Sequence, residues 1–376
     1  MGDATTTTAA PQPTLDQPAP AVAIGAVGKP SSLRLTMDEL TAGIDDDFKA
    51  VVAKLQQTFN FLANMKKGRA THTFGAAARG EARCIVSPDF PKSDFFTFGR
   101  TYPVAVRHSS PGGRADDRAR DGVAAAIKFF EPGGSTDGKG IYDILMNAGR
   151  QLFVRSIRDF STFVHTKPED RIGLEAAGLM LKDQLREAYR IRGSFTDSRY
   201  HSWVCFEYED DAGTMRYIRF RLIAGDRGPE RGLPAADFVA RGQPSMDPLP
   251  EDDRAPDFLR KDFVYRVENS EVRYILQAQL HERPQPAVEN HPLLDPSQPW
   301  NEYWHPWHDL FEIRLTEILD DDAVTAMDMN PNRSPPCIRI PLATSPDHFA
   351  SLGHARAIVY PGARAVRAAA PSPQSN

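Results

Sequence analysis

Residues 69–75 of this 376-residue chain read RATHTFG. One histidine, His72, lies between two hydroxyl side chains, three positions after Arg69 and just before a glycine-containing run. A polar turn with a solvated histidine is the ordinary interpretation of such a stretch. An imidazole with a pKa near 6.5 can also take up and return a proton at neutral pH, so a catalytic base is the alternative.

Three later stretches also combine an ordered run with polar side chains. Residues 101–110 read TYPVAVRHSS, a strand-like run that ends on Arg107, His108 and two serines, and residues 142–147 read YDILMN and end on Asn147. Residues 356–367 read RAIVYPGARAVR. Arg356 and Tyr360 are four positions apart there, which places them on one face of a helix. Taken singly, each stretch is also compatible with a strand end or a basic surface helix.

The composition excludes several classes of protein. Apolar residues make up 41% of the chain and charged residues 25%, and the net charge is −5, so no overall attraction to nucleic acid or anionic membranes is indicated. The cysteines, Cys84, Cys205 and Cys337, are far apart, which argues against a disulfide framework or a zinc knuckle and favours the cytoplasm. No apolar run is long enough to predict a transmembrane helix.

The chain divides into a leader and one large domain. Residues 1–34 are rich in Thr, Ala, Pro and Gly and lack the regions of a secretory signal, so they are predicted to be a disordered leader. Residues 35–376 are predicted to form a single domain. It opens with a capping box at 36–39 and a helical pattern over 44–65.

Short β-type runs separated by Gly- and Pro-rich breaks dominate the domain. They indicate an antiparallel barrel or sandwich with attached helices, an α+β fold. The strands are expected near 82–86, 103–108, 125–130, 141–146, 151–155, 201–208, 215–223, 272–281 and 311–318, and the helices near 168–190, 255–268 and 345–367.

The arginine–tyrosine pair at 356 and 360 has a specific chemical use. A tyrosine hydroxyl with a pKa of about 10 is neutral at pH 7. A guanidinium one turn away, together with a ferric ion, stabilises the phenolate because opposite charge favours the ionised form. A phenolate is an axial ligand of haem iron in catalases.

The four stretches, in this order, resemble the haem catalase superfamily. That family has an Arg-x-x-His-x-x-Gly element, a Thr-Pro-x-x-x-Arg strand, an asparagine after an apolar strand, and a late Arg-x-x-x-Tyr-Pro. The matching residues here are Arg69, His72 and Gly75; Arg107, with Thr101-Tyr102-Pro103 in place of Thr-Pro; Asn147; and Arg356, Tyr360 and Pro361.

The similarity is greatest to the compact catalase-related type, which includes the coral allene oxide synthase haem domain and small mycobacterial-type haem peroxidases. This similarity runs from about Lys66 to the C-terminus. It is carried by four stretches: RATHT at 69–73, FFTFGRTYP at 95–103, DFLRKDFV at 257–264 and HPW at 305–307. The resemblance implies the eight-stranded antiparallel barrel of the catalase core with flanking helices and without a C-terminal helical domain.

The resemblance also implies a haem b site with two sides. On the distal side, His72 would be the catalytic histidine and Asn147 the second catalytic group, with Thr71 beside them. Tyr360 would be the ligand of the iron. The remaining residues would hold the cofactor. Arg69, Arg107 and Arg367 would bind its propionates, and Arg356 would stabilise the Tyr360 phenolate. Phe153 and Phe160 would pack on the porphyrin ring.

Thr71 bears on the activity, because classical catalases usually have valine at that position. A hydroxyl there can hydrogen-bond the imidazole or the bound peroxide and disturb proton transfer through a second hydrogen peroxide molecule. The expected function is a haem peroxidase that reduces organic hydroperoxides with a small-molecule reductant and has weak or no catalase activity. The alternatives are a hydroperoxide dehydratase of allene oxide synthase type, a minimal true catalase and a non-enzymatic haem carrier. No nucleic acid or integral membrane partner is expected, and the protein would be a monomer or homodimer.

Overall fold

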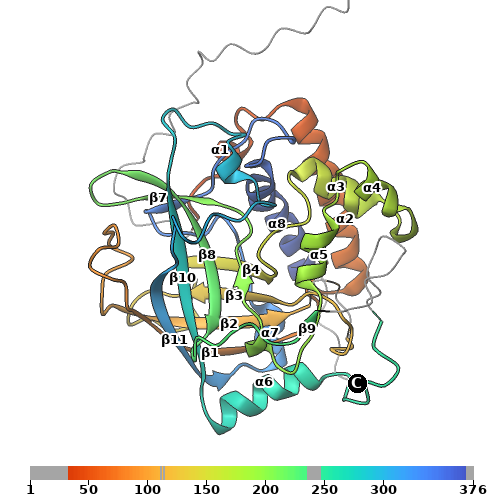
Figure 1. The fold of residues 1–376 in the computed structure, drawn as a ribbon, viewed down its shortest axis with the longest axis vertical. Helices are drawn as coiled ribbons and strands as arrows, with labels where there is room; N and C mark the ends of the chain where they lie inside the picture. The colour runs from red at the N-terminus through yellow and green to blue at the C-terminus, as the bar shows by residue number, and fades with distance from the viewer. Residues whose placement is uncertain (1–32, 111, 113–114, 235–246, 370–376) are drawn as a thin grey trace, which may run out of the picture.

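The computed structural model describes residues 33–110, 112, 115–234 and 247–369 (Figure 1). Residues 1–32 of the predicted leader lie outside the described residues. The last two residues of this leader, 33 and 34, are described, and the backbone N–H of Arg34 donates to the carbonyl of Asn332 at 2.9 Å. The division into a leader and a single domain stays a prediction.

An eight-stranded antiparallel barrel forms the centre of the molecule. Its strands follow the order β10-β11-β1-β2-β3-β4-β6-β8, and pairing of β8 with β10 closes it. Closure confirms the barrel over the sandwich and leaves no free edge in this ring. The strands are β1 (Gly75–Cys84), β2 (Thr101–Ser109), β3 (Ala124–Phe129), β4 (Tyr142–Ala148), β6 (Tyr200–His201), β8 (Met215–Ala224), β10 (Val272–Glu282) and β11 (His308–Ile318).

Helices cover one side of this barrel, where Figure 1 shows α1, α2, α3 and α8 grouped together. Helix α8 contacts α1, α2 and α3, and α6 contacts β1 and β11. The helices are α1 (Met37–Thr41), α2 (Asp46–Lys66), α3 (Ile157–His165), α4 (Ile172–Ala176), α5 (Lys182–Ala188), α6 (Phe258–Asn269), α7 (Asp321–Ala326) and α8 (Ser351–Ala369). Minor elements are β5 (Arg190–Ile191), β7 (Phe206–Glu209), β9 (Leu233–Pro234), β12 (Ile338–Arg339) and the 3₁₀ turns Pro168–Asp170, Phe195–Asp197 and Pro292–Leu294.

Strand β2 shows how the barrel sorts its side chains. Alternate residues of a strand point to opposite faces. Tyr102 lies in the barrel core, where its ring is 5.8 Å from that of Phe311 on β11. Arg107 and Ser109, five and seven positions later, face the opposite way and meet the loop that contains His72. The polar end of β2 is therefore presented on the outer face of the barrel.

Several predicted elements are wrong in detail. No strand forms at 151–155; that segment is irregular and leads to α3, which Ser156 caps through the N–H of Asp159. The helix expected over 168–190 is divided into shorter pieces, and Gly178 has a φ of 70° where the chain turns. The strand expected over 201–208 is divided into β6 and β7 around Trp203, whose φ is 56°. Both divisions fall where the backbone enters the left-handed region, which ends regular structure.

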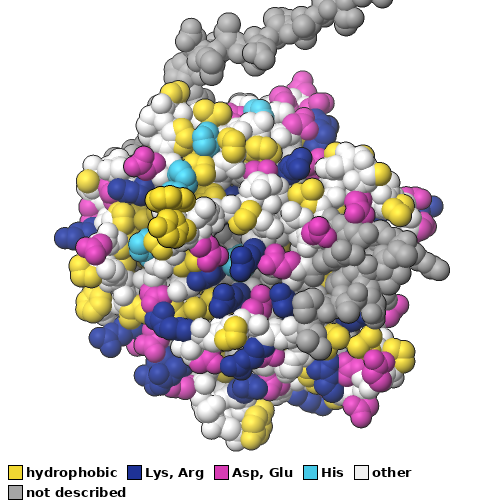
Figure 2. Space-filling view, in the orientation of Figure 1, with side chains coloured by type: hydrophobic (Ala, Val, Ile, Leu, Met, Phe, Trp, Pro, Cys, Tyr) yellow, Lys and Arg dark blue, Asp and Glu magenta, His cyan; other side chains and the backbone are white. Residues whose placement is uncertain are grey.

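Acidic and basic side chains are interspersed over the face seen in Figure 2, and basic side chains gather near its middle. Among the described residues, no helix combines the length and the apolar character needed to cross a membrane.

A buried ionic cluster joins β3, β4 and the segment after α7. Lys128 donates to Asp143 at 2.8 Å, Arg333 contacts the same carboxylate, and the backbone N–H of Asn330 donates to it at 2.7 Å. We expect Asp143→Ala to lower the free energy of unfolding by about 3–5 kcal/mol, because it leaves two buried cations without this partner. Urea unfolding measures the change. Asp137→Ala, which removes an exposed partner of Arg79, is the control and should cost less than about 1 kcal/mol.

Candidate active site

His72 lies in the loop between α2 and β1 in an unusual backbone conformation. Its φ is 55°, which only a few per cent of non-glycine residues adopt. The Arg107 guanidinium donates to the His72 carbonyl at 2.8 Å, and Ser109 Oγ is 3.0 Å from the ring nitrogen Nδ1. Two residues of β2 therefore fix the backbone and the ring of His72 together.

The charge state of His72 follows from its surroundings. Enclosure by the protein, and then the positive charges of Arg107 and Arg69, lower the pKa of His72 to about 3. The imidazole is therefore neutral at physiological pH and has a lone pair free to accept a proton. A neutral base held at a defined angle is what proton abstraction needs.

Asn147 lies on the same face of the barrel as Ser109. Ser109 is opposite Ala124 in the β2–β3 register, and Ala124 is opposite Asn147 in the β3–β4 register. Directly opposed residues point to the same side of a sheet. Within the described part of the chain the Asn147 amide has no hydrogen-bond partner, so it is free to donate to a ligand.

Small side chains separate these polar groups. Ala124 lies between Ser109 and Asn147 in one row of opposed residues across β2, β3 and β4. In the next row on the same face, Ala126 lies between Arg107 on β2 and Leu145 on β4. Alanines at these two positions leave a shallow apolar floor between Arg107 and Asn147. A flat aromatic ring system can rest on such a floor without displacing a large side chain.

Three arginines from separate segments meet at one edge of this floor. Arg69 and Arg367 both donate to the carbonyl of Met327, Arg367 at 3.4 Å, and Arg107 is buried beside them. Burial, and then Arg107 and Arg367, lower the pKa of Arg69 well below its ordinary value. Burial, and then Arg367, lower the pKa of Arg107 to about 10. Among the described residues none of the three has a carboxylate oxygen within 4.0 Å.

This cluster is a test of whether haem fits. Three mutually repelling guanidinium groups destabilise one another unless an anion joins them. Among the residues that the structure describes, the buried Nε atoms of Arg69 and Arg107 have no hydrogen-bond partner. Haem carries two carboxylates on one edge of a flat ring, and guanidinium binds carboxylate through paired, charge-assisted hydrogen bonds. The arginine cluster and the alanine floor together fit this group.

Tyr360 lies on α8 with Arg356 one turn before it. The Arg356 guanidinium carbon is 5.5 Å from the centre of the Tyr360 ring. Within the described residues the Tyr360 hydroxyl has no hydrogen-bond partner, so its oxygen is available as a ligand. The positive charge of Arg356 contributes to the lowered pKa of His72, which puts α8 near the loop with the histidine.

Helix α8 can take this position because it lies close to α2. A Cβ added at Gly362 would be 2.3 Å from the Gln56 side-chain nitrogen, so a larger residue there would require the end of the Gln56 side chain to move. Figure 1 shows the two helices side by side. The contact holds α8, the helix that contains Tyr360, against α2.

Comparison with known proteins gives the family. No model of a known protein family matches the sequence. The chain is 73% identical over 232 residues to protein y4iK of Sinorhizobium fredii, all of which it covers. It is 30% identical to the linolenate 9R-lipoxygenase of Nostoc sp., 29% identical to the allene oxide synthase-lipoxygenase protein of Plexaura homomalla and 26% identical to the catalase-related peroxidase of Mycolicibacterium paratuberculosis. These matches include 86%, 78% and 62% of this chain.

The solved structures agree on the fold. A fungal catalase matches 81% of this chain with a TM-score of 0.60 at 19% sequence identity. The chain belongs to the catalase-related superfamily. It spans 42% of the Nostoc protein, 27% of the Plexaura protein, 69% of the Mycolicibacterium protein and 60% of the fungal catalase.

Two predicted residues of this catalase-related protein have other main contacts. Phe153 packs edge-on against Phe163, with ring centres 4.6 Å apart, and Phe160 is half-buried on α3 against the main core. Within the described residues neither ring has an aromatic contact with His72 or Tyr360. Their place against a porphyrin stays a prediction.

The hydroxyl that touches the imidazole belongs to Ser109 and not to Thr71. Thr71 is exposed, whereas Ser109 is buried with its oxygen at hydrogen-bonding distance of His72. In the sequence, Ser109 was recognised only as part of a strand end, and no role in the site was predicted for it. The signal that could have found it is the two-residue spacing from Arg107, which puts both on one face of β2.

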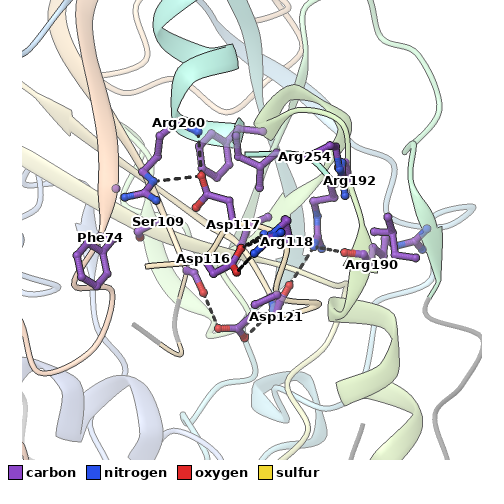
Figure 3. A pocket seen from close by; sticks show the side chains of 18 residues that line it. Phe74, Ser109, Asp116, Asp117, Arg118, Asp121, Arg190, Arg192, Arg254 and Arg260 are labelled. Carbon is purple, nitrogen blue, oxygen red and sulfur yellow. Dashed lines mark hydrogen bonds and ion pairs between the residues drawn. The ribbon is translucent and has the colours of Figure 1, made fainter. Parts of the chain in front are cut away.

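A charged recess adjoins Ser109. Figure 3 shows Ser109 and Phe74 lining it together with arginines and aspartates from three segments of the chain, 116–121, 190–192 and 254–260. Its charges largely neutralise each other, since Arg260 lies 3.1 Å from Asp117 and Arg118 lies 2.7 Å from Asp116. The recess therefore places paired charges next to the serine that holds His72.

His108, next to Ser109, points into the barrel and makes stability depend on pH. It is 0% exposed and 2.8 Å from the Tyr274 hydroxyl, and burial, followed by Arg107, lowers the pKa of His108 to about 3. The unfolded chain takes up a proton at this residue near pH 6.5, and the folded chain does so only near pH 3. Stability should therefore fall as pH drops through that window, by up to about 1.4 kcal/mol per pH unit for one histidine.

When the pH is lowered from 7 to 5, we expect the free energy of unfolding to fall less in His108→Phe than in the wild type. Urea unfolding at the two pH values measures this. His348→Gln is the opposing control, because the hydrogen bond to Glu289 raises the pKa of His348. The pair of His348 and Glu289 stabilises the fold at pH values below the pKa that His348 has in the unfolded chain. His348→Gln should therefore lower the free energy of unfolding more at pH 5 than at pH 7. Equal pH dependence in His108→Phe and wild type would contradict the assignment.

Proposed function

We propose that this protein is a haem b-dependent peroxidase that reduces organic hydroperoxides with a small-molecule reductant and has weak or no catalase activity. The observation that carries the proposal is the neutral His72 imidazole, held by Ser109 on the face of the barrel that also presents the free Asn147 amide. The relative named as a catalase-related peroxidase supports the reaction class.

The residues have separate tasks in this proposal. Arg69, Arg107 and Arg367 bind the propionates, and Tyr360, with Arg356 against its ring, supplies the oxygen ligand. Haem, when bound, supplies the iron at which the peroxide O–O bond is cleaved. His72 would take the proton from the hydroperoxide and return it to the departing oxygen, which leaves as an alcohol. The small-molecule reductant would supply the two electrons, and with solvent the protons, that complete the reduction to alcohol and water. Asn147 donates a hydrogen bond that holds the peroxide in line.

A hydroperoxide dehydratase is the second candidate. It is favoured by the 29% identity to the allene oxide synthase-lipoxygenase protein, which exceeds the 26% identity to the catalase-related peroxidase. A dehydratase converts the hydroperoxide without an electron donor. Incubation of the haem-loaded protein with a fatty-acid hydroperoxide, with and without reductant, separates the two. Stoichiometric oxidation of the reductant supports the peroxidase, and substrate loss that ignores the reductant overturns it.

Thr71→Val tests the preference for organic hydroperoxides. We expect the ratio of hydrogen peroxide disproportionation to organic hydroperoxide reduction to rise by about tenfold, which corresponds to the loss of one hydrogen bond. In this proposal that bond runs from the Thr71 hydroxyl to the bound peroxide, since the hydroxyl that contacts the imidazole is that of Ser109. Oxygen evolution and alcohol formation measure the two reactions on the same preparation. Thr73→Val, on the other side of His72, is the matched control, since its hydroxyl donates to the Arg69 carbonyl. An unchanged ratio in Thr71→Val would remove Thr71 from the site.

A further inference from the structure

The two halves of α8 are anchored differently on either side of Tyr360. The buried residues of this helix all lie between Ser351 and Val359. Every residue of 360–369 is at least partly exposed. Pro361 has no backbone N–H, so one helical hydrogen bond is missing directly after Tyr360. The half that follows Tyr360 therefore needs contacts of its own to keep a fixed position.

Asp328, two residues after α7, supplies such a contact. Its carboxylate oxygen Oδ2 is 3.0 Å from Nη1 of Arg364 on α8. The same oxygen accepts a hydrogen bond from Arg333 at 2.9 Å, and the other oxygen is 3.7 Å from Nζ of Lys128 on β3. Arg364 is four positions after Tyr360, so both lie on one face of α8. One carboxylate therefore connects this face of the helix to the barrel.

The Asp328–Arg364 pair is part of a network. The Asp328 side chain is 22% exposed, whereas its partners Lys128 and Arg333 are only 5% and 6% exposed. Both of those cations also contact the buried Asp143 carboxylate, which fixes them within the barrel. Isolated surface ion pairs stabilise little, because two mobile side chains lose freedom when they pair. Here the barrel side is already fixed, and only the Arg364 side chain, 52% exposed, has to be ordered.

The backbone next to Asp328 meets α8 at a second point. The Met327 carbonyl accepts hydrogen bonds from Arg69 and from Arg367, the latter at 3.4 Å. Residues 327 and 328 therefore contact both arginines of α8 that follow Tyr360. A shift of this half of α8 would move Tyr360 and Arg367 together, away from the arginines of the loop and the barrel.

We propose that Asp328 is a positioning residue for the cofactor site. Through Arg364 it holds the second half of α8 against the barrel. The Tyr360 oxygen and the Arg367 guanidinium then keep a fixed place relative to Arg69 and the barrel wall. Asp328 acts through α8 and is assigned no contact with the cofactor or the substrate. The inference rests on the proposed haem site and adds a residue to it.

The charge of Asp328 has a second effect, of opposite sign. Burial alone would raise the pKa of Asp328, but the hydrogen bond from Arg333 and the nearby cations outweigh it and lower that pKa, so the carboxylate is ionised. Burial is the main influence on the pKa values of Arg69 and Arg367 and lowers both, whereas the Asp328 charge raises them. Removal of this charge would leave the cluster more positive and strengthen the binding of an anionic ligand. Loss of positioning would weaken it.

Amide hydrogen exchange of the full-length protein without hemin tests the effect on α8. Peptides that cover 360–369 should exchange about two- to fivefold faster in Asp328→Asn and in Arg364→Gln than in the wild type, as expected for one partly exposed ion pair. Arg266→Gln is the matched control, since Arg266 on α6 is 47% exposed and pairs with Asp262, which is 24% exposed. It should leave exchange of 360–369 unchanged. Unaltered exchange in Asp328→Asn and Arg364→Gln would overturn the inference.

Hemin titration tests the consequence for the cofactor. Asp328→Asn should bind hemin about tenfold more weakly than the wild type, the lower end of the range for loss of a residue that orients a metal ligand. Its ferric-phenolate charge-transfer band should also shift. Arg364→Gln should change affinity and band in the same direction, and Asp328→Glu, which keeps the charge, should restore most of the affinity. Arg364 is half-exposed, so Arg364→Gln decides the test if Asp328→Asn does not fold.

The other outcomes of the titration are equally decisive. Tighter binding by Asp328→Asn would show that Asp328 only offsets the charge of the arginine cluster, and unchanged affinity and band would show that it has no role. Either result overturns the inference. A wild-type protein that does not bind hemin contradicts the haem site itself, and the exchange measurement on the free protein is independent of that outcome.

Discussion

Tyr360→Phe should yield a folded protein that no longer retains haem. The substitution removes one oxygen atom, the proposed ligand, and leaves the ring, its contact with Arg356 and the α8–α2 interface in place. Loss of an outer-shell partner alone lowers metal affinity by about 10–100-fold, so loss of the ligand itself should lower haem affinity by more than about 100-fold. Hemin titration followed by the Soret band measures the affinity, and far-UV circular dichroism checks the fold.

Tyr265→Phe is the matched control, since Tyr265 is exposed on α6. It should bind hemin like the wild type. The wild-type spectrum should also contain charge-transfer bands of a ferric phenolate, which Tyr360→Phe lacks. Unchanged affinity and an unchanged spectrum in Tyr360→Phe would show that another residue ligates the iron. A wild-type protein that stays colourless with hemin would overturn the whole site.

His72→Ala should lower turnover of an organic hydroperoxide by about 10²–10⁴-fold at unchanged haem content, which is the range for loss of a general acid–base group. The physical reason is that His72 is neutral and fixed by Ser109, so its lone pair can accept a proton without reorganisation. Steady-state rates with cumene hydroperoxide, normalised to bound haem, measure the effect.

A second variant separates proton transfer from positioning. His72→Gln keeps a polar side chain near Ser109 but cannot carry the proton, so it should be about as slow as His72→Ala. His281→Ala, on β10 outside the candidate site, should keep the wild-type rate. Undiminished turnover in both His72 variants would favour a haem carrier over an enzyme.

The types of residue in the candidate site could be predicted from sequence because they occur in short local patterns. His72 and Arg69 are three positions apart, and Arg356 and Tyr360 are four apart, so a single loop or helix turn relates each pair. The helix over 44–65 and most barrel strands were also predictable, since hydrophobic periodicity is a local property. The predicted strand at 151–155 was wrong because three apolar residues in a row, Leu152 to Val154, do not distinguish a buried irregular segment from a strand.

The sequence alone determined the kinds of chemical group available: a histidine, an asparagine, a tyrosine and a set of arginines in a fixed order. Only the tertiary structure decided their partners. Closure of the barrel by β8 and β10, the Ser109 bond to His72 and the meeting of Arg69 with Arg367 at the Met327 carbonyl all join segments far apart in the chain. Such contacts depend on register and burial, which local patterns do not encode.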